Sequence, residues 1–251
     1  MPHRKIRHCI LTLAAAVSFM AQAAELTVSA AASLTNAFKE LAPLFEAAHP
    51  GHKVQLNFAA SGVLLQQITK GAPVDVFASA DQETMDQAQA QNLVKPAQRR
   101  DFVSNSLVVI VPAASARSPK TLAELSQPGY ARIAIGLPAS VPVGRYTQGV
   151  LEAAGLWGAI QPKMVGATNV RQALDYVQRA EVDAGFVYAT DAALLSDKVK
   201  LAFRVPTAKP ILYPVATLSA SPNAALGERF VQFLFAAPAR AVLTRHGFGQ
   251  P

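Results

Sequence analysis

Apolar runs of strand length alternate with amphipathic helical segments along most of the chain, and this alternation restricts the fold more than any other feature. Residues 107–111 are a continuous apolar run, and residues 26–30 alternate apolar and polar side chains; both have the length expected for strands. Residues 33–48 instead carry four large apolar side chains at the 4-3-4 spacing of one helix face, namely Leu34, Phe38, Leu41 and Phe45. Strands and helices that alternate in this way predict an α/β protein with mostly parallel sheets.

Two of the predicted strands indicate that these α/β units form two lobes. Each of these strands, at residues 107–111 and 215–219, lies next to a block of alternating strands and helices. No helix separates either strand from the blocks that it borders. The chain could therefore cross from one lobe to the other at each strand. We expect two Rossmann-like lobes joined by a hinge of crossing strands, with residues 24–105 plus 213–251 in lobe 1 and residues 106–212 in lobe 2. A single doubly wound sheet is the alternative.

The first 23 residues have the pattern of a secretory signal peptide. Three basic residues precede an apolar run at 9–20, and an Ala-Gln-Ala sequence ends the segment at Ala23. The apolar run is shorter than the roughly 20 residues that a membrane-spanning helix needs, although an uncleaved anchor is the alternative. We therefore expect residues 1–23 to be removed and the mature protein to be periplasmic.

Composition narrows the functional classes further. The chain is 51% hydrophobic and 16% charged, which suits a large buried core and excludes a disordered chain or a coiled coil. Its formal charge of +7 becomes +4 without the leader residues Arg4, Lys5 and Arg7. This small, scattered excess favours anions and gives no basic patch for nucleic acid. The only cysteine, Cys9, lies in the leader, so the mature chain has no disulfide and no cysteine metal ligand.

Motifs of the common enzyme classes do not occur in the sequence. We find no Gly-x-Ser-x-Gly elbow, no His-Glu-x-x-His, no phosphate-binding Gly-x-x-x-x-Gly-Lys-Ser/Thr loop and no Gly-x-Gly-x-x-Gly after the first strand. His49 and His52 flank a Pro-Gly turn, where solvated side chains are a better interpretation than a metal site. Asp81 is expected to cap a helix and Asp75 to make a local turn or pairing contact. We therefore expect a protein that is not an enzyme and that uses no metal or cofactor.

Polar, uncharged residues occupy four places where a predicted strand gives way to a helix. They lie at residues 31–35, 58–62, 141–146 and 167–170. The first turn of a helix leaves backbone N–H groups without intrahelical partners and carries a partial positive charge. Small residues there let a ligand approach the backbone closely. Four such helix ends facing one cleft would bind a tetrahedral dianion without any lysine or arginine.

A series of short motifs covers essentially the whole mature chain in a fixed order. The motifs are Ala-Ala-Ser-Leu-Thr-Asn-Ala at 31–37, Gly-Ala-Pro-Val-Asp-Val-Phe-Ala-Ser-Ala-Asp at 71–81, Asn-Ser-Leu-Val-Val at 105–109, Val-Pro-x-Gly at 141–144, Asn-Val-Arg at 169–171, and Gly-Phe-Val-Tyr at 185–188 with Asp191. In these residues the chain resembles the periplasmic molybdate-binding proteins of ABC importers. The resemblance implies the type II periplasmic-binding-protein fold and a receptor for molybdate and tungstate. It also implies a membrane permease and an ATPase as partners, and a monomer is expected.

The resemblance also implies which residues contact the oxyanion. Two serines would offer hydroxyl and N–H groups, two valines would offer only their N–H groups, and a tyrosine would offer its hydroxyl. Val143 stands where relatives often have alanine, and Ala60-Ser61-Gly62 replaces a richer serine run. Arg145 and Arg171 are expected at the rim, where they could steer an anion. The implied ligand residues are Ser33, Ser61, Val143, Val170 and Tyr188.

Other interpretations of these residues stay open. Ser33 and Ser61 could be ordinary helix caps, each worth about 1 kcal/mol to its helix, and Tyr188 could be a half-buried sheet residue with its hydroxyl in water. The same fold could hold another tetrahedral oxyanion such as sulfate or phosphate. A secreted hydrolase that uses Ser33 or Ser61 is a further alternative, although no base accompanies either serine in the sequence. A site made only of donors suits a fully deprotonated dianion, and discrimination against sulfate would come from size.

Overall fold

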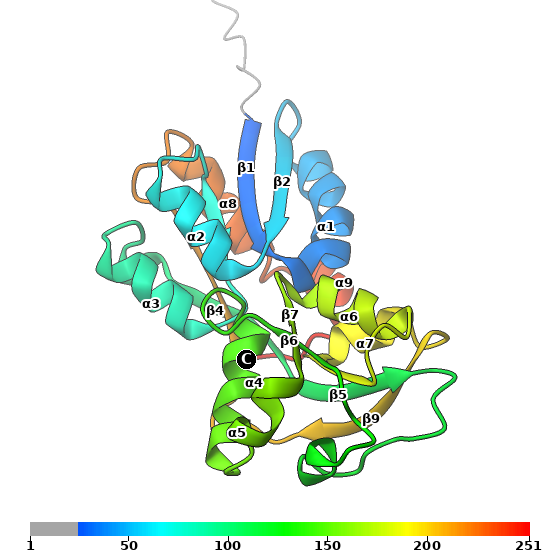
Figure 1. Ribbon diagram of the computed structural model, residues 1–251. Helices are drawn as coiled ribbons and strands as arrows, with labels where there is room; N and C mark the ends of the chain where they lie inside the picture. The colour runs from blue at the N-terminus through cyan, green and yellow to red at the C-terminus, as the bar shows by residue number, and fades with distance from the viewer. Residues whose placement is uncertain (1–24) are drawn as a thin grey trace, which may run out of the picture.

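The computed structural model describes residues 25–251, and its strands form two separate five-stranded sheets (Figure 1). The predicted signal peptide lies outside the described residues. The first sheet has the strand order β2-β1-β3-β10-β4. In it β1, β2 and β3 run parallel, and β10 runs antiparallel to both of its neighbours. Its strands are β1 (Glu25–Ala31), β2 (Lys53–Ala59), β3 (Val76–Ala78), β4 (Arg100–Asn105) and β10 (Ile211–Thr217).

The second sheet has the strand order β7-β6-β8-β5-β9. Its strands β6, β7 and β8 are parallel, and β5 pairs antiparallel with both β8 and β9. Both sheets therefore combine a parallel core with antiparallel strands contributed by the crossing segments. The strands are β5 (Leu107–Pro112), β6 (Ile133–Gly136), β7 (Met164–Ala167), β8 (Ala184–Tyr188) and β9 (Val199–Val205).

Helices cover both sheets, and each sheet with its helices forms one half of the molecule. In the first half, α1, α2, α3 and α8 pack on the strands of the first sheet and α9 packs on α1. In the second half, α4, α6 and α7 pack on the second sheet, with α5 against α4. The helices are α1 (Thr35–Ala48), α2 (Ser61–Thr69), α3 (Gln82–Ala90), α4 (Pro142–Ala153), α5 (Trp157–Ile160), α6 (Val170–Gln178), α7 (Ala189–Leu194), α8 (Ala224–Phe233) and α9 (Ala237–Arg245). Short 3-10 helices add η1 (Ala32–Leu34), η2 (Pro96–Gln98), η3 (Ala123–Ser126) and η4 (Gln161–Lys163).

The chain passes between the halves at two places. Only Ser106 separates β4 of the first sheet from β5 of the second, and residues 206–210 connect β9 back to β10. In Figure 1 the elements β1, β2, α1 and α2 lie in the upper part of the view, and β5, β9, α4 and α5 lie in the lower part. The two α/β halves and the mixed sheets agree with the predicted fold class, and the single-sheet alternative is wrong.

The buried apolar side chains explain why these segments fold as they do. Leu26, Val28 and Ala30 of β1 and every residue of β5 are buried, as expected for strands covered on both faces. The helical stripe of α1 points inward, where the rings of Phe45 and Phe230 meet edge to face with 5.1 Å between their centroids. Burial of this kind is the main source of stability for the described chain, which contains no cysteine.

Several predicted boundaries differ from the structure. Strand β4 was not predicted, because only Phe102 and Val103 of its six residues are buried and they are adjacent, which hides the alternation of a strand. The first regular helix begins at Thr35, since residues 32–34 form a 3-10 turn. Asp191 lies within the first turn of α7, where it is completely buried.

None of the helices within residues 25–251 is both long enough and apolar enough to cross a membrane.

Gly144 supplies a stability test, because the first turn of α4 packs directly against strand β6. A Cβ atom at Gly144 would lie 2.0 Å from the carbonyl oxygen of Gly136, whereas a Cβ at Gly149 of the same helix would contact nothing. Gly144→Ala should therefore lower the free energy of unfolding by about 1–3 kcal/mol. Gly149→Ala should raise it by roughly 0.5–1 kcal/mol through helix propensity. Urea denaturation of both variants checks this, and equal effects would contradict the close packing.

Candidate functional site

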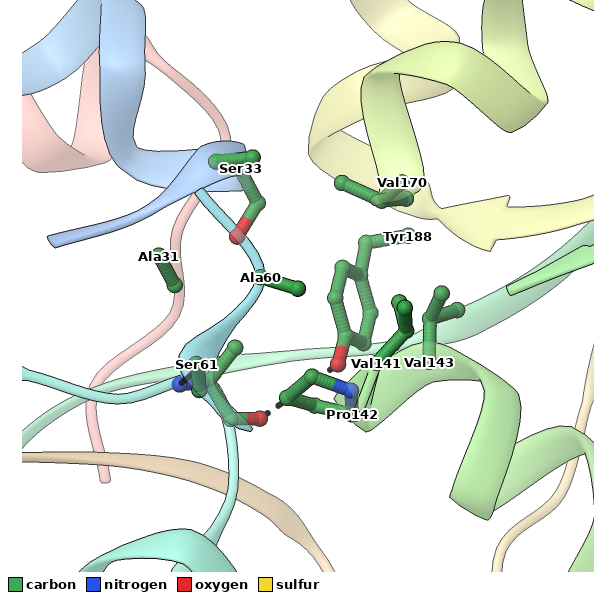
Figure 2. Close-up of a pocket in the computed structure, with 11 residues that line it drawn as sticks. Ala31, Ser33, Ala60, Ser61, Val141, Pro142, Val143, Val170 and Tyr188 are labelled. Atoms are coloured by element: carbon green, nitrogen blue, oxygen red, sulfur yellow. Dashed lines mark hydrogen bonds between the residues drawn. The ribbon is translucent and has the colours of Figure 1, made fainter. Parts of the chain in front are cut away.

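One small cavity lies between the two halves, at the ends of strands β1, β2 and β8. It is narrow, with a cavity volume of about 10 Å³, and is lined by all five ligand residues that the family resemblance implied. Figure 2 shows Ser33, Ala60 and Ser61 on one side of the cavity, facing Val143, Val170 and Tyr188 on the other. The structure therefore brings together residues up to 155 positions apart in the sequence. The complete lining is Ala31, Ala32, Ser33, Ala60, Ser61, Ala80, Val141, Pro142, Val143, Val170 and Tyr188.

The first half contributes two serines, and neither hydroxyl caps its own helix. Ser61 is the first residue of α2, and its Oγ accepts a hydrogen bond from the Ala80 N–H at 3.0 Å. Ser33 lies in η1, and its Oγ is 3.0 Å from the hydroxyl of Tyr213. No side-chain cap occurs at α1 or α2, so the helix-cap alternative is wrong for both serines. Because Ser33 and Ser61 stand at the starts of helical turns, their N–H groups lack intrahelical acceptors.

The second half contributes backbone N–H groups at two helix N-termini. Val143 follows Pro142 in the first turn of α4, and Val170 is the first residue of α6. The Asn169 side chain caps α6 by accepting from the N–H groups of Arg171 and Gln172, at 2.9 and 3.1 Å. The cap serves those two groups, which leaves the Val170 N–H beside the cavity for another acceptor.

Tyr188 ends strand β8 and is almost completely buried, with 1% of its surface exposed. Its hydroxyl donates to the Ala80 carbonyl at 3.3 Å. Burial raises the pKa of this phenol well above its usual value, so the hydroxyl keeps its proton and can donate at any physiological pH. The alternative of a half-buried tyrosine with its hydroxyl in water is therefore wrong.

Arg145 does not line the cavity but joins the two halves beside it. Its guanidinium lies 2.7 Å from the Asp81 carboxylate, and it also donates to the hydroxyl of Thr84 at 2.6 Å. Asp81 in turn caps α3 by accepting from the Thr84 N–H, as the sequence predicted. At the rim, where it was expected, Arg145 thus forms an ion pair that links α4 to the start of α3.

Arg171 makes a second bridge between the halves. It donates to the carbonyl oxygen of Ser33 at 3.2 Å and to the side chain of Asn36 at 2.8 Å. Its Nε lies 2.6 Å from Oδ1 of Asp191, a carboxylate with no exposed surface. Both arginines therefore hold the halves together outside the cavity. Within residues 25–251, no charged side chain lines the cavity.

Three residues of the site were not expected from the sequence. Ala80 donates its N–H to Ser61 and accepts from Tyr188, so this backbone unit connects two ligand residues. Tyr213 of β10 contacts Ser33, and Asn105 contacts Tyr213 at 3.2 Å. Asn105 belongs to the Asn-Ser-Leu motif, from which its place near the site could have been predicted. Tyr213 carried no signal, because only the folded chain brings it to Ser33, 180 residues away.

The other candidate groups have structural roles. Oδ2 of Asp75 accepts from the Thr27 N–H and Oδ1 from the Ser221 hydroxyl, at 2.8 and 2.6 Å. Asp75 is therefore a pairing residue, but its partners are 48 and 146 residues away and the expected local contact is wrong. His49 contacts the Phe45 carbonyl near the end of α1. Among residues 25–251, no three His, Cys, Asp or Glu side chains gather as a metal site would require.

The lining defines what the cavity can bind. Its polar groups are hydroxyls and backbone N–H groups, and its remaining surface is alanine, valine and proline. Two helix N-termini from each half add partial positive charge without a cation. A small anion that offers only acceptor oxygens matches this arrangement, whereas a ligand without acceptor atoms would leave the donors unpaired.

The buried Asp191 carboxylate supplies a pH test. Burial raises its pKa from 3.8 to about 6, against the opposing attraction of Arg171. The native state keeps this proton in a pH range where the unfolded chain has lost it, so Asp191 lowers stability as pH rises through that window. Relative to wild type, the free energy of unfolding of Asp191→Asn should rise between about pH 4 and pH 6 and stay level above it. Urea denaturation across this range measures the difference, and a flat profile would contradict the raised pKa.

Comparisons with known proteins identify the family of this chain. The model of the family described as bacterial extracellular solute-binding protein matches residues 26–249. The molybdate-binding protein ModA of Escherichia coli is 37% identical over 95% of this chain and 94% of its own length, and ModA of Haemophilus influenzae is 34% identical over 97% of each. The solved structure of the Azotobacter vinelandii periplasmic molybdate-binding protein has a TM-score of 0.78 and 27% identity, covering 90% of this chain and 99% of that one. The chain therefore belongs to the bacterial extracellular solute-binding protein family.

Proposed function

We propose that this protein is the molybdate receptor of an ABC importer, that it also binds tungstate, and that it works in the periplasm after loss of residues 1–23. The ModA relatives support the molybdate ligand, since two of them match this chain over nearly its full length. Extracellular solute-binding proteins deliver ligands to a membrane permease driven by an ATPase, and these are the partners of the proposal. The protein acts as a monomer and performs no chemistry on its ligand.

The observation that carries the proposal is the composition of the cavity lining. Ser33, Ser61, Val143, Val170 and Tyr188 surround one space, and they can offer it hydroxyl and backbone N–H donors once Tyr188 turns its proton from the Ala80 carbonyl to the ligand. Molybdate at neutral pH is a dianion with four acceptor oxygens. A carboxylate in the lining would repel it, and the structure has none there.

The two halves act as lobes that close on the ion. We assign residues 24–105 plus 213–251 to one lobe and residues 106–212 to the other, with the crossing segments β4–β5 and β9–β10 as the hinge. The N–H of Gly62 donates to the Ser140 carbonyl across the halves at 3.0 Å, directly beside the cavity. Closure removes water from the ion, which strengthens its hydrogen bonds, and presents a distinct surface to the permease.

The hydrolase alternative has no support in the geometry of the serines. A nucleophilic serine needs a base that takes its proton. The neighbours of the two hydroxyls are a tyrosine hydroxyl at Ser33 and a backbone N–H at Ser61, and neither group is a base.

A thermal unfolding series with tetrahedral anions tests the ligand. Molybdate or tungstate at a thousandfold excess over the dissociation constant should stabilise the protein by about 4 kcal/mol, which raises Tm by several degrees. Sulfate and phosphate at the same concentration should have much smaller effects, because a cage sized for molybdate leaves longer hydrogen bonds to the smaller ions. A shift with sulfate or phosphate and none with molybdate would assign the site to a different oxyanion.

Substitutions in the lining separate side-chain donors from backbone donors. Ser33→Ala should weaken molybdate binding by roughly 1.5–3 kcal/mol, because it removes a hydrogen bond to a charged partner. Val143→Ala should bind nearly as well as wild type, since Val143 contributes only its N–H. Isothermal titration calorimetry measures both affinities. If Ser33→Ala binds normally, Ser33 is not a ligand residue.

A further inference from the structure

The cavity serine Ser33 is the end of a buried chain of hydrogen bonds that begins where the polypeptide crosses between the halves. This series of hydrogen bonds runs from Ser106 through Asn105 and Tyr213 to Ser33. Tyr213 is fully buried, and Ser33 is 3% exposed. Each bond in this chain has a direction that the chemistry of its neighbours determines.

The first step orients the Asn105 side chain. The Ser106 N–H donates to Oδ1 of Asn105 at 2.9 Å. Only the oxygen of an amide can accept from an N–H, so the NH₂ group must point the other way. Its two protons reach Thr190 Oγ1 at 2.9 Å and the Tyr213 hydroxyl at 3.2 Å.

The second step orients the Tyr213 hydroxyl. Its oxygen already accepts from Asn105, and Ser33 Oγ lies 3.0 Å away. If Ser33 donated to this oxygen, the proton of Tyr213 would be left in the interior without the acceptor that Ser33 offers, and a buried unpaired donor is destabilising. Burial also raises the pKa of Tyr213 well above its usual value, so that proton stays on the phenol. Tyr213 must therefore donate to Ser33.

We propose that Asn105 and Tyr213 are positioning residues that make Ser33 an obligatory hydrogen-bond donor toward the cavity, and that the site thereby selects oxyanions that carry no proton. Ser33 Oγ accepts from Tyr213, so the serine's own proton is left to point at the ligand. Ser61 has the same polarity, because its Oγ accepts from the Ala80 N–H. A protonated oxyanion would bring its own O–H against the proton of Ser33.

This inference rests on the proposed function, and it adds a cause of selectivity that is independent of size. Sulfate and phosphate have nearly the same size, but phosphate keeps at least one proton at neutral pH and sulfate keeps none. The proton also lowers the mean charge of phosphate, so the change of their affinity ratio between wild type and a variant isolates the hydrogen-bond effect of the proton. Fit to the cavity alone would treat the two ions alike.

The test uses Tyr213→Phe, with sulfate and phosphate competing against bound molybdate in calorimetric titrations at neutral pH. Wild type should prefer sulfate over phosphate. In Tyr213→Phe no partner holds the proton of Ser33 toward the cavity, so the hydroxyl can rotate and accept from the ligand, and this preference should shrink roughly fivefold to tenfold, the effect of one hydrogen bond. Asn105→Ala should change the ratio in the same direction, because Tyr213 then loses the donor that fixes its hydroxyl.

Controls separate selectivity from a loss of structure. Tyr130→Phe removes the hydroxyl of another buried tyrosine, close to Glu124 and away from the cavity, and should leave the ratio unchanged. Thermal unfolding of the ligand-free variants reports damage to the fold. If Tyr213→Phe binds molybdate but weakens sulfate and phosphate by the same factor, the residue only supports the fold and the inference is overturned. Failure of wild type to bind molybdate would instead overturn the proposed function, and this inference with it.

Discussion

A doubly charged anion can be buried without a cation only if fixed, neutral donors replace its water, and this requirement governs the architecture of the molecule. An unpaired charge in the interior is very costly, whereas N–H groups at helix N-termini are donors already present and already oriented. The fold brings such ends from α2, α4 and α6, together with the η1 turn, to one place between two sheets. Alanine, serine and valine dominate the lining, and such residues let the ligand approach the backbone closely.

Burying the anion among backbone donors has a second consequence, which is that backbone segments must approach one another closely. Gly136 and Gly144 let β6 and α4 touch behind Val143, and Gly62 lets α2 meet the Ser140 carbonyl across the halves. The charged side chains near the cavity lie outside this closely packed region and have a different role. Arg145 and Arg171 reach from the second half to Asp81 and to the Ser33 carbonyl in the first. The molecule thus separates anion binding, which uses neutral donors, from contact between the halves, which uses ion pairs and charge-assisted hydrogen bonds.

The sequence predicted what local pattern and family motifs encode. Strand and helix alternation predicted the two-part α/β fold, and the motifs at residues 31–37, 141–144 and 169–171 predicted residues that meet at one cavity. What could not be predicted depends on contacts between distant segments. Strand β4 has too few buried residues to show a period, and Tyr213 reaches Ser33 only because β10 pairs with β3, the neighbour of β1 in the sheet. Arg145 and Arg171 were expected at an open rim because nothing local identifies partners that lie 64 and 138 residues away.

Anomalous diffraction at the molybdenum absorption edge, from crystals of the protein grown with molybdate, tests the anion cage most directly. The arrangement described above predicts one strong molybdenum position between the halves, with the oxygens of the intact ion within hydrogen-bond distance of N–H groups from both α2 and α4. The guanidinium groups of Arg145 and Arg171 should remain on Asp81 and Asp191. A molybdenum position against either arginine, or one held by a single half of the molecule, would contradict a cage of neutral donors.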